Sequence, residues 1–366
     1  MRNRMIYSML VMLLLIFAGC GNMEEQTATE PEPAPPDPPA PVALSVSDFH
    51  DVLADLDLSG ATLTYNGEVE DACPAGAAIR AGSYVEALRD FTWEVCDVPE
   101  DWDGSDGYRY QLTAPGVTMT AFQRDRNLHV VTDSGEGLFT LPPIEDAQVS
   151  RMIFDTFEFW YNEARAAVLY SGEGMPLTVE EMNWFEDYTA SVTIDYDDTR
   201  DDYIARTTAI SCFFTSEYSD PKDMDAQAFL YYCPDQGILG EEDEEEFRLV
   251  QAKLDWRSGE DNHLFTVMEM PVPCHRLPRS YINEILTQYA GIAVEEMHTD
   301  WTEEALYILE TDCFYSLASD FGPGSFTPRY GEKTGDIVTL WSSSHMLTLQ
   351  KSGEFWHILS HEPVDS

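Results

Sequence analysis

The chain has 366 residues, of which 67 are Asp or Glu and 20 are Lys or Arg, so its formal net charge at pH 7 is −47. A field of this sign repels phosphate backbones and anionic lipid headgroups, which excludes nucleic acid as an expected partner. The hydrophobic content of 44% and the aromatic content of 12% are typical of a globular protein. The length exceeds what one hydrophobic core usually supports, about 250–300 residues, so we expect two domains.

The N-terminus has the pattern of a secretory signal peptide. Arg2 and Arg4 precede an apolar run over 5–18, and the small residues Ala18 and Gly19 stand directly before Cys20. The run is shorter than the roughly 20 apolar residues that a membrane-spanning helix needs. We therefore predict a signal peptide over residues 1–19. It is either a lipoprotein signal that ends before Cys20 or an ordinary cleaved signal that happens to contain a cysteine, and the first is favoured.

The segment Phe17-Ala18-Gly19-Cys20 resembles the signal peptide of bacterial lipoproteins. The resemblance implies that Cys20 is diacylated on its thiol and becomes the new N-terminus, with Phe17 where that family more often has Leu. Two acyl chains give durable attachment, whereas one holds a protein only marginally. The expected location is the cell membrane, with the protein lipid-anchored and facing the outside.

Residues 20–43 form an expected linker of low complexity. Seven prolines lie between positions 31 and 41, which favours polyproline II at about 3.1 Å per residue and a reach of roughly 30 Å. Removal of Arg2 and Arg4 with the signal would take the net charge from −47 to −49. The lipid would then be the only contact with the membrane.

Six cysteines follow Cys20, an even number that permits disulfides outside the cytoplasm. Cys73 and Cys96 fall alone in the first expected domain, so their pairing is the single disulfide that the sequence favours. The alternative is that all six are buried free thiols.

The first expected domain, residues 44–172, has an α+β pattern. Short separators such as Pro115-Gly116 between four successive apolar segments predict an antiparallel meander. The predicted helices are 47–58, 81–93 and 144–169, and the predicted strands are 61–69, 107–114, 117–124, 128–134 and 137–142.

The second expected domain, residues 173–366, reads as mostly helical with a closing β-meander. Thr178 with Glu181 three residues later has the spacing of a capping box, and Asp220-Pro221 is typical of a helix start. The predicted helices are 176–188, 220–233, 241–254, 279–291 and 302–318, and the predicted strands are 336–343, 345–351 and 354–361.

The C-terminal half resembles a group of uncharacterised lipoproteins from Gram-positive anaerobes. The residues that carry the resemblance are Pro176-Leu177-Thr178, Phe214-Thr215-Ser216-Glu217-Tyr218, Pro221-Lys222-Asp223-Met224, Leu306-Tyr307-Ile308-Leu309-Glu310-Thr311-Asp312 and Leu347-Thr348-Leu349. It covers about half of the chain and implies the extracytoplasmic address and the two-part architecture. It carries no functional residues.

No sequence motif points to a cofactor or a metal, and we expect neither. The acidic runs 195–202 and 101–107 lack the Gly and Glu that an EF-hand loop requires at positions six and twelve, which leaves at most a looser calcium turn. His357 and His361 lie four apart in a segment that alternates like a strand, without the helical frame of a zinc site. Cys274 beside His275 is not a nucleophile–base pair, because adjacent side chains diverge.

Two further groups of residues have both a structural and a functional interpretation. The runs Trp301, Tyr307, Phe314, Tyr315 and Phe154, Phe157, Trp160, Tyr161 are candidates for a sugar-binding platform, but their helical spacing favours the core. Ser342-Ser343-Ser344-His345 offers hydroxyls and an imidazole at an expected hairpin turn.

These observations favour a lipid-anchored extracytoplasmic protein that binds or scaffolds at the cell envelope, with no enzymatic activity. The expected partners are an envelope protein, a peptide or a glycan. The alternative is an extracytoplasmic hydrolase that acts on glycan or peptide through carboxylates. An aromatic cleft with two convergent carboxylates would favour the enzyme.

Overall fold

The computed structural model describes residues 42–66, 72–97, 107–123, 127–142, 151–197, 202–234, 237–254, 265–299, 306–317, 322 and 324–364. Residues 41–366 belong to one compact unit. The predicted signal peptide, Cys20 and almost all of the proline-rich linker lie outside the described residues. No helix in the part of the chain that is described is long and apolar enough to cross a membrane.

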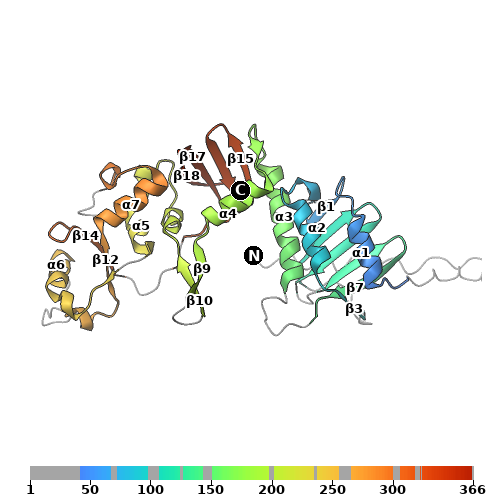
Figure 1. Cartoon of the computed structure of the whole chain (residues 1–366), viewed down its shortest axis with the longest axis horizontal. Helices are drawn as coiled ribbons and strands as arrows, with labels where there is room; N and C mark the ends of the chain where they lie inside the picture. The colour runs from blue at the N-terminus through green and yellow to red at the C-terminus, as the bar shows by residue number, and fades with distance from the viewer. Residues whose placement is uncertain are drawn as a thin grey trace, which may run out of the picture. The chain divides into compact units, whose positions relative to one another are not determined.

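The N-terminal half of this unit contains a seven-stranded sheet with the strand order β2-β1-β4-β5-β6-β7-β3 (Figure 1). Every pairing is antiparallel, and β4 to β7 form the predicted meander. The strands are β1 (Thr62–Tyr65), β2 (Cys73–Pro74), β3 (Glu94–Cys96), β4 (Arg109–Ala114), β5 (Val117–Phe122), β6 (Leu128–Thr132) and β7 (Gly135–Thr140).

Three helices pack on this sheet: α1 (Val46–Ala54), α2 (Ala81–Asp90) and α3 (Met152–Tyr170). Ser45 caps α1 with a capping box. The long helix α3 buries one apolar face against the sheet, including Phe157 and Trp160, which are both fully buried. The core beneath these helices draws its buried residues from positions 44–164 alone.

The C-terminal half is rich in strands as well as helices. The helices are α4 (Val179–Tyr188), α5 (Ala226–Tyr232), α6 (Glu244–Leu254) and α7 (Arg279–Ala290). The strands are β8 (Met175–Pro176), β9 (Val192–Asp197), β10 (Asp202–Thr207), β11 (Gly237–Ile238), β12 (Cys274–Pro278), β13 (Leu306–Ile308), β14 (Cys313–Leu317), β15 (Tyr330–Thr334), β16 (Ile337–Trp341), β17 (His345–Ser352) and β18 (Phe355–Pro363).

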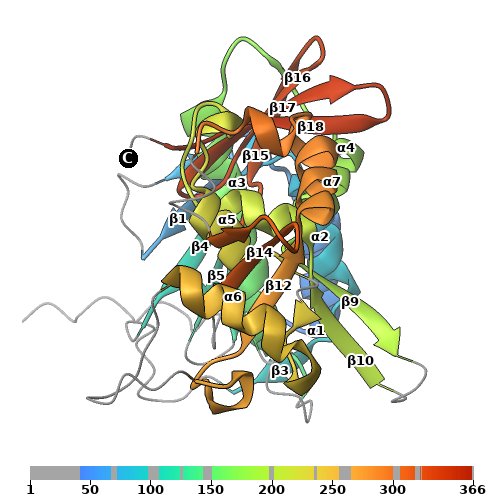
Figure 2. The same cartoon turned by 90° about the vertical axis from the view of Figure 1, so that its left-hand side faces the viewer.

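These strands form a hairpin of β9 and β10 (Figure 2, lower right), a four-stranded sheet of order β11-β12-β14-β13, and a five-stranded sheet of order β18-β17-β16-β15-β8. The four-stranded sheet packs on both faces. Cys274, Cys313 and Tyr315 share a small core with α6, whereas Leu277 and Phe314 face the larger core of this half, whose buried members span positions 177–358.

The mixed α+β class and the two antiparallel meanders are confirmed. The expectation of a mostly helical second half is wrong, because the C-terminal region is strand-rich. Residues 302–318, predicted as a helix, contain β13 and β14, and residues 220–233 contain a 3₁₀ turn over Pro221–Asp223 before α5 begins.

The expected Cys73–Cys96 disulfide is contradicted. Cys73 lies on β2 and Cys96 on β3, which form the opposite edges of the seven-stranded sheet, and both are free thiols. Neighbouring strands are about 4.8 Å apart, and a disulfide needs Cα atoms within about 7 Å. The two cysteines are alone in the first half of the sequence but not close in space, because β1 and the four strands of the meander lie between β2 and β3.

Candidate functional site

A cavity of ≈790 Å³ opens beside α5, between the C-terminal end of α6 and the strands β13 and β14. Its size falls in the range of roughly 300–1,000 Å³ that is usual for ligand pockets. The lining residues include charged or polar groups (Lys222, Asp223, Asp225, Gln227, Tyr231, Lys253, His298, Thr299) and apolar groups (Met224, Leu230, Leu254, Leu306, Leu317).

The local sequence explains how α5 frames this cavity. Asp220 caps the 3₁₀ turn at Pro221 by accepting a hydrogen bond from the Lys222 main-chain N–H at 2.9 Å. Asp225 then caps α5 by accepting from the Ala228 N–H, also at 2.9 Å. Two successive caps turn the chain sharply, so that Lys222 and the first turn of α5 line the same cavity.

Lys222 and His298, which both line the cavity, have acidic partners. Lys222 Nζ lies 3.2 Å from Glu296 Oε1, and His298 Nδ1 lies 2.7 Å from Asp223 Oδ1. The main chain ties the two pairs together, because the His298 N–H donates to the Lys222 carbonyl at 2.8 Å.

Lys253 differs from these groups. Its Nζ donates to the main-chain carbonyl of Tyr307 at 2.6 Å, and within the described residues it forms no ion pair. An ammonium has three donors and a full charge, and a carbonyl satisfies only one donor and none of the charge. Lys253 is in the last turn of α6, where the helix dipole favours a cation.

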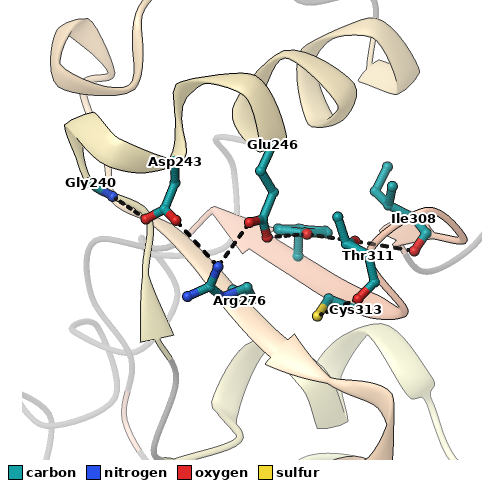
Figure 3. Close-up of polar contacts among 8 residues, drawn as sticks. Gly240, Asp243, Glu246, Arg276, Ile308, Thr311 and Cys313 are labelled. Carbon is teal, nitrogen blue, oxygen red and sulfur yellow. Dashed lines mark hydrogen bonds and ion pairs between the residues drawn. The ribbon is translucent and has the colours of Figure 1, made fainter.

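A polar cluster lies between α6 and the face of the four-stranded sheet next to it (Figure 3). Arg276 Nη1 contacts Glu246 Oε2 at 2.8 Å and Asp243 Oδ1 at 3.4 Å. The other oxygen of Asp243 accepts from the Gly240 N–H at 2.9 Å. The Tyr315 hydroxyl bonds to Glu246 and lies 2.8 Å from Thr311 Oγ1.

This cluster holds α6 on the sheet and offers no nucleophile. Burial raises the pKa of the Cys274 thiol to about 12 and also raises the pKa of Cys313, with Glu246 adding to both shifts. Burial, together with the hydrogen bond to Glu246, raises the pKa of the Tyr315 hydroxyl. All three groups therefore stay protonated at neutral pH. A cysteine attacks as its thiolate, so neither of the two thiols is activated.

Most of the two acidic runs lies outside the part of the chain that the structure describes. Asp195 lies on β9, where its carboxylate is 3.5 Å from Arg206 across the hairpin. Residues 198–201 and 98–106 lie outside the described residues. Elsewhere in the described chain, no group of three or more His, Cys, Asp or Glu side chains could hold a metal ion.

The histidine and cysteine pairs of the sequence do not converge. His357 pairs with Gln350 and His361 with Leu347, three positions apart on β17, because a bulge shifts the register between Thr348 and Leu349. The two imidazoles therefore lie on opposite faces of the sheet. Cys274 and His275 are neighbours on β12 and alternate in the same way.

The structure places Glu217 next to Ser344 and His345, a contact that the sequence did not suggest. Ser344 Oγ lies 2.8 Å from His345 Nδ1, and His345 Nε2 lies 3.4 Å from Glu217 Oε1. The imidazole also stacks on His361, with ring centroids 4.5 Å apart. Ser344 is in the turn between β16 and β17, as expected, whereas Glu217 comes from a distant loop that no local pattern links to it.

The aromatic run in α3 is core, as its spacing favoured, because Phe154, Phe157, Trp160 and Tyr161 are all buried. In the second run Phe314 and Tyr315 are buried on opposite faces of β14, not along a helix, and Trp301 lies outside the described residues.

Comparison with known proteins identifies no relative: no family model, no curated protein and no solved structure matches this chain. The structure defines a mixed α+β protein with a cavity that is lined by two lysines and two aspartates, and its function has to be argued from that site.

Proposed function

We propose that this chain is a lipid-anchored, extracytoplasmic binding protein that takes a carboxylate-bearing ligand in the cavity beside α5. The observation that carries the proposal is the position of Lys253. The chain has only four lysines among 366 residues, and two of them, Lys222 and Lys253, line this one cavity. Lys222 is paired with Glu296, whereas Lys253 has no acidic partner among the described residues, so the ammonium of Lys253 is the group that would attract an anion at short range.

The remaining lining groups suggest the rest of the ligand. Leu254, Leu306 and Leu317 supply an apolar wall close to Lys253. A ligand with a carboxylate next to an apolar side chain would pair with Lys253 and pack on the leucines. The C-terminus of a peptide has these two features. The acidic surface of the protein disfavours ligands with several negative charges, so a single carboxylate fits best.

Isothermal titration calorimetry with two matched peptides tests this assignment. The probe is acetyl-Ala-Ala-Leu with a free C-terminal carboxylate, and the control probe is the same peptide with a C-terminal amide. We expect the acid to bind and the amide to bind at least about tenfold more weakly, because a charge-assisted hydrogen bond contributes about 1.5–3 kcal/mol. Equal affinities for the two peptides, or binding of neither, would refute the carboxylate assignment.

A pair of lysine variants locates the binding. Lys253→Met keeps most of the aliphatic stem and removes the charge, so it should abolish the difference between acid and amide. Lys351→Met removes one lysine far along the sequence, on β17, and should leave the difference unchanged. A Lys253→Met protein that still prefers the acid would place the carboxylate elsewhere.

The lipid anchor rests on the N-terminal sequence. If Cys20 carries the acyl chains, Cys20→Ser should release a folded protein from the membrane fraction or leave its signal peptide uncleaved, since the acidic body has no electrostatic attraction to anionic lipid. Fractionation of cells and mass determination of the N-terminus measure both outcomes. A processed Cys20→Ser protein that stays in the membrane fraction would rule out this anchor.

The two halves support a proposal of two domains, 44–172 and 173–366. The buried residues of the two large cores come from separate parts of the chain, positions 44–164 and 177–358. At the junction, Glu332 accepts hydrogen bonds from the N–H groups of Gly172 at 2.7 Å and Gly174 at 3.2 Å. A fragment of residues 44–172 should give a cooperative thermal transition, and a fragment without one would mean a single domain.

Hydrolysis is a second candidate, and Ser344 with His345 and Glu217 is the observation that favours it. With Nδ1 accepting from the serine hydroxyl, Nε2 carries a proton and can donate to Glu217, the arrangement that activates a serine. A fluorophosphonate probe tests this: Ser344 Oγ would attack phosphorus and displace fluoride, with its proton passing to His345. If the protein still binds peptide but forms no adduct at Ser344, hydrolysis at this serine is refuted and the binding function remains.

A further inference from the structure

A second, smaller hollow lies where α4 meets the five-stranded sheet. Its volume is ≈190 Å³, and the lining residues are Leu177, Glu181, Trp184, Phe185, Lys333, Gly335, Val338 and Trp356. None of these residues lines the cavity beside α5. Leu177, Phe185 and Val338 are buried and form an apolar floor.

The tryptophan on α4 is held in place although it is half exposed. Trp184 has 48% of its surface exposed. Its ring stacks on Tyr188 with centroids 5.1 Å apart and planes 12° apart, and it meets Phe185 edge-on at 4.9 Å. Because two neighbours fix the indole, its free surface is a rigid platform and loses little side-chain entropy when it is covered.

The second tryptophan is fixed by the same helix. Trp356 meets Phe185 edge-on with ring centroids 5.1 Å apart. Its main-chain carbonyl accepts a hydrogen bond from the Tyr188 hydroxyl at 2.6 Å. Both indoles therefore contact the same ring, Phe185.

A single ion pair supplies the polar groups of this hollow. Lys333 on β15 contacts Glu181 on α4. Glu181 also accepts from the Thr178 main-chain N–H at 2.9 Å in the capping box of α4. The pair offers one ammonium and one carboxylate with no net charge.

We propose that this hollow binds one ring of a neutral glycan. One face of a pyranose ring presents C–H groups, which pack against the negative face of an indole, while its hydroxyls can accept from Lys333 and donate to Glu181. The rings and the ion pair are complementary to that mixture of apolar face and polar rim.

Two other occupants fit less well. An apolar side chain of a protein partner would cover the ion pair and leave its remaining donors and acceptors without hydrogen bonds, which is costly. An anionic sugar would meet a neutral ion pair on a protein of net charge −47. A neutral ring with several hydroxyls avoids both penalties.

Titration with neutral oligosaccharides tests the site through intrinsic tryptophan fluorescence and calorimetry. The probes are cellotetraose and chitotetraose, with tetragalacturonate as the anionic comparison. We expect at least one neutral probe to bind with a dissociation constant near or below about 1 mM and tetragalacturonate to bind at least about tenfold more weakly. Absence of binding by both neutral probes, or preference for the anionic one, would overturn the proposal.

Three variants separate the site from general effects on the fold. Trp184→Ala should weaken binding by about tenfold or more, and Lys333→Met should weaken it by several-fold. Tyr203→Ala removes another exposed ring, 70% exposed on β10, and should leave the affinity unchanged. Circular dichroism confirms folding of each variant. A folded Trp184→Ala protein with wild-type affinity would refute the site, and this outcome is independent of peptide binding in the other cavity.

Discussion

Arg80 and Glu163 form a buried ion pair whose disruption should produce a pH-dependent loss of stability. Glu163 on α3 is fully buried, and the Arg80 side chain is 15% exposed. Arg80 precedes α2, donates to Glu163, and also contacts Glu186 on α4. Burial raises the pKa of Glu163, and the charge of Arg80 opposes that rise. Replacing Arg80 with methionine would leave the carboxylate buried without its cation.

The size of the loss follows from the proton that Glu163 can then take up. Keeping a Glu with an ordinary pKa of 4.5 neutral in the folded state costs about 1.4 kcal/mol per pH unit above that value. The charge contribution to destabilisation is therefore at most about 3.4 kcal/mol at pH 7 and about 0.7 kcal/mol at pH 5. Because the folded-state pKa is raised, this loss is absent below pH 4.5 and grows as the pH rises.

Urea unfolding of Arg80→Met and of the wild type at pH 7 and pH 5 measures the effect. We expect the difference in unfolding free energy between the two proteins to be larger at pH 7 than at pH 5, by up to about 2.7 kcal/mol. Glu186→Gln is the matched control, because Glu186 is 40% exposed and such pairs contribute about 0–1 kcal/mol. The double variant Arg80→Met/Glu163→Gln should lose the pH dependence. An equal loss at both pH values in Arg80→Met would refute the buried-charge argument.

The structure sets the direction of the stability change for three glycine substitutions, and it predicts the number of thiols. Gly291→Ala should destabilise the protein by about 1 kcal/mol or more, because Gly291 has φ +66° at the end of α7 and a Cβ there would lie 2.5 Å from His357 Nδ1. Gly82→Ala in α2 should stabilise it by about 0.5–1 kcal/mol, because a Cβ there would have no atom within 4 Å. Thermal denaturation measures both variants, and a shift of the two midpoints in the same direction would contradict this reasoning. Gly331→Ala should cost about 1–3 kcal/mol, because its Cβ would lie 2.6 Å from Leu177 Cδ1, and an unchanged unfolding midpoint would contradict the close packing. A thiol titration of the denatured, unreduced chain from residue 21 onward should find six thiols, since none of the six cysteines there forms a disulfide, and a count of four would reveal one.

Local signals in the sequence located many elements correctly. Thr178 with Glu181 begins α4 through the predicted capping box. Gly116 with φ +75° and Gly353 with φ +64° lie at hairpin turns, where left-handed backbone favours glycine. Caps and turns are set by residues within a few positions of each other, so the sequence contains all the information that they need.

Strands that depend on distant partners could not be predicted in this way. Residues 302–318 have aromatic residues at helical spacing, yet β14 forms because it pairs with β12, about 40 residues earlier in the chain. β13 then pairs with β14 through a turn in which Asp312 has φ +51°. The sequence gives β13 and β14 no clear alternation of apolar and polar residues, because β14 is buried on both faces.

The candidate cavity was missed for the same reason. Lys222, Lys253 and His298 come from three separate segments, and none belongs to a motif with a fixed spacing. One signal was available: lysine is so scarce in this chain that every lysine is worth locating. Scarcity indicates which residues to follow, but only the tertiary structure shows that two of them line one cavity.

The positions of all four lysines link the two proposed sites. Lys222 and Lys253 line the cavity beside α5, Lys333 lines the hollow of Trp184, and Lys351 Nζ lies 5.8 Å from the ring centroid of Trp356 at that hollow. A lysine that served only solubility would be equally useful anywhere on the surface, and in a chain with 67 acidic residues it would reduce the net charge wherever it stood. Three of the four lysines line one of the two hollows, and the fourth contacts a tryptophan that lines the second, so the placement of these scarce ammonium groups supports the proposed peptide and glycan sites together.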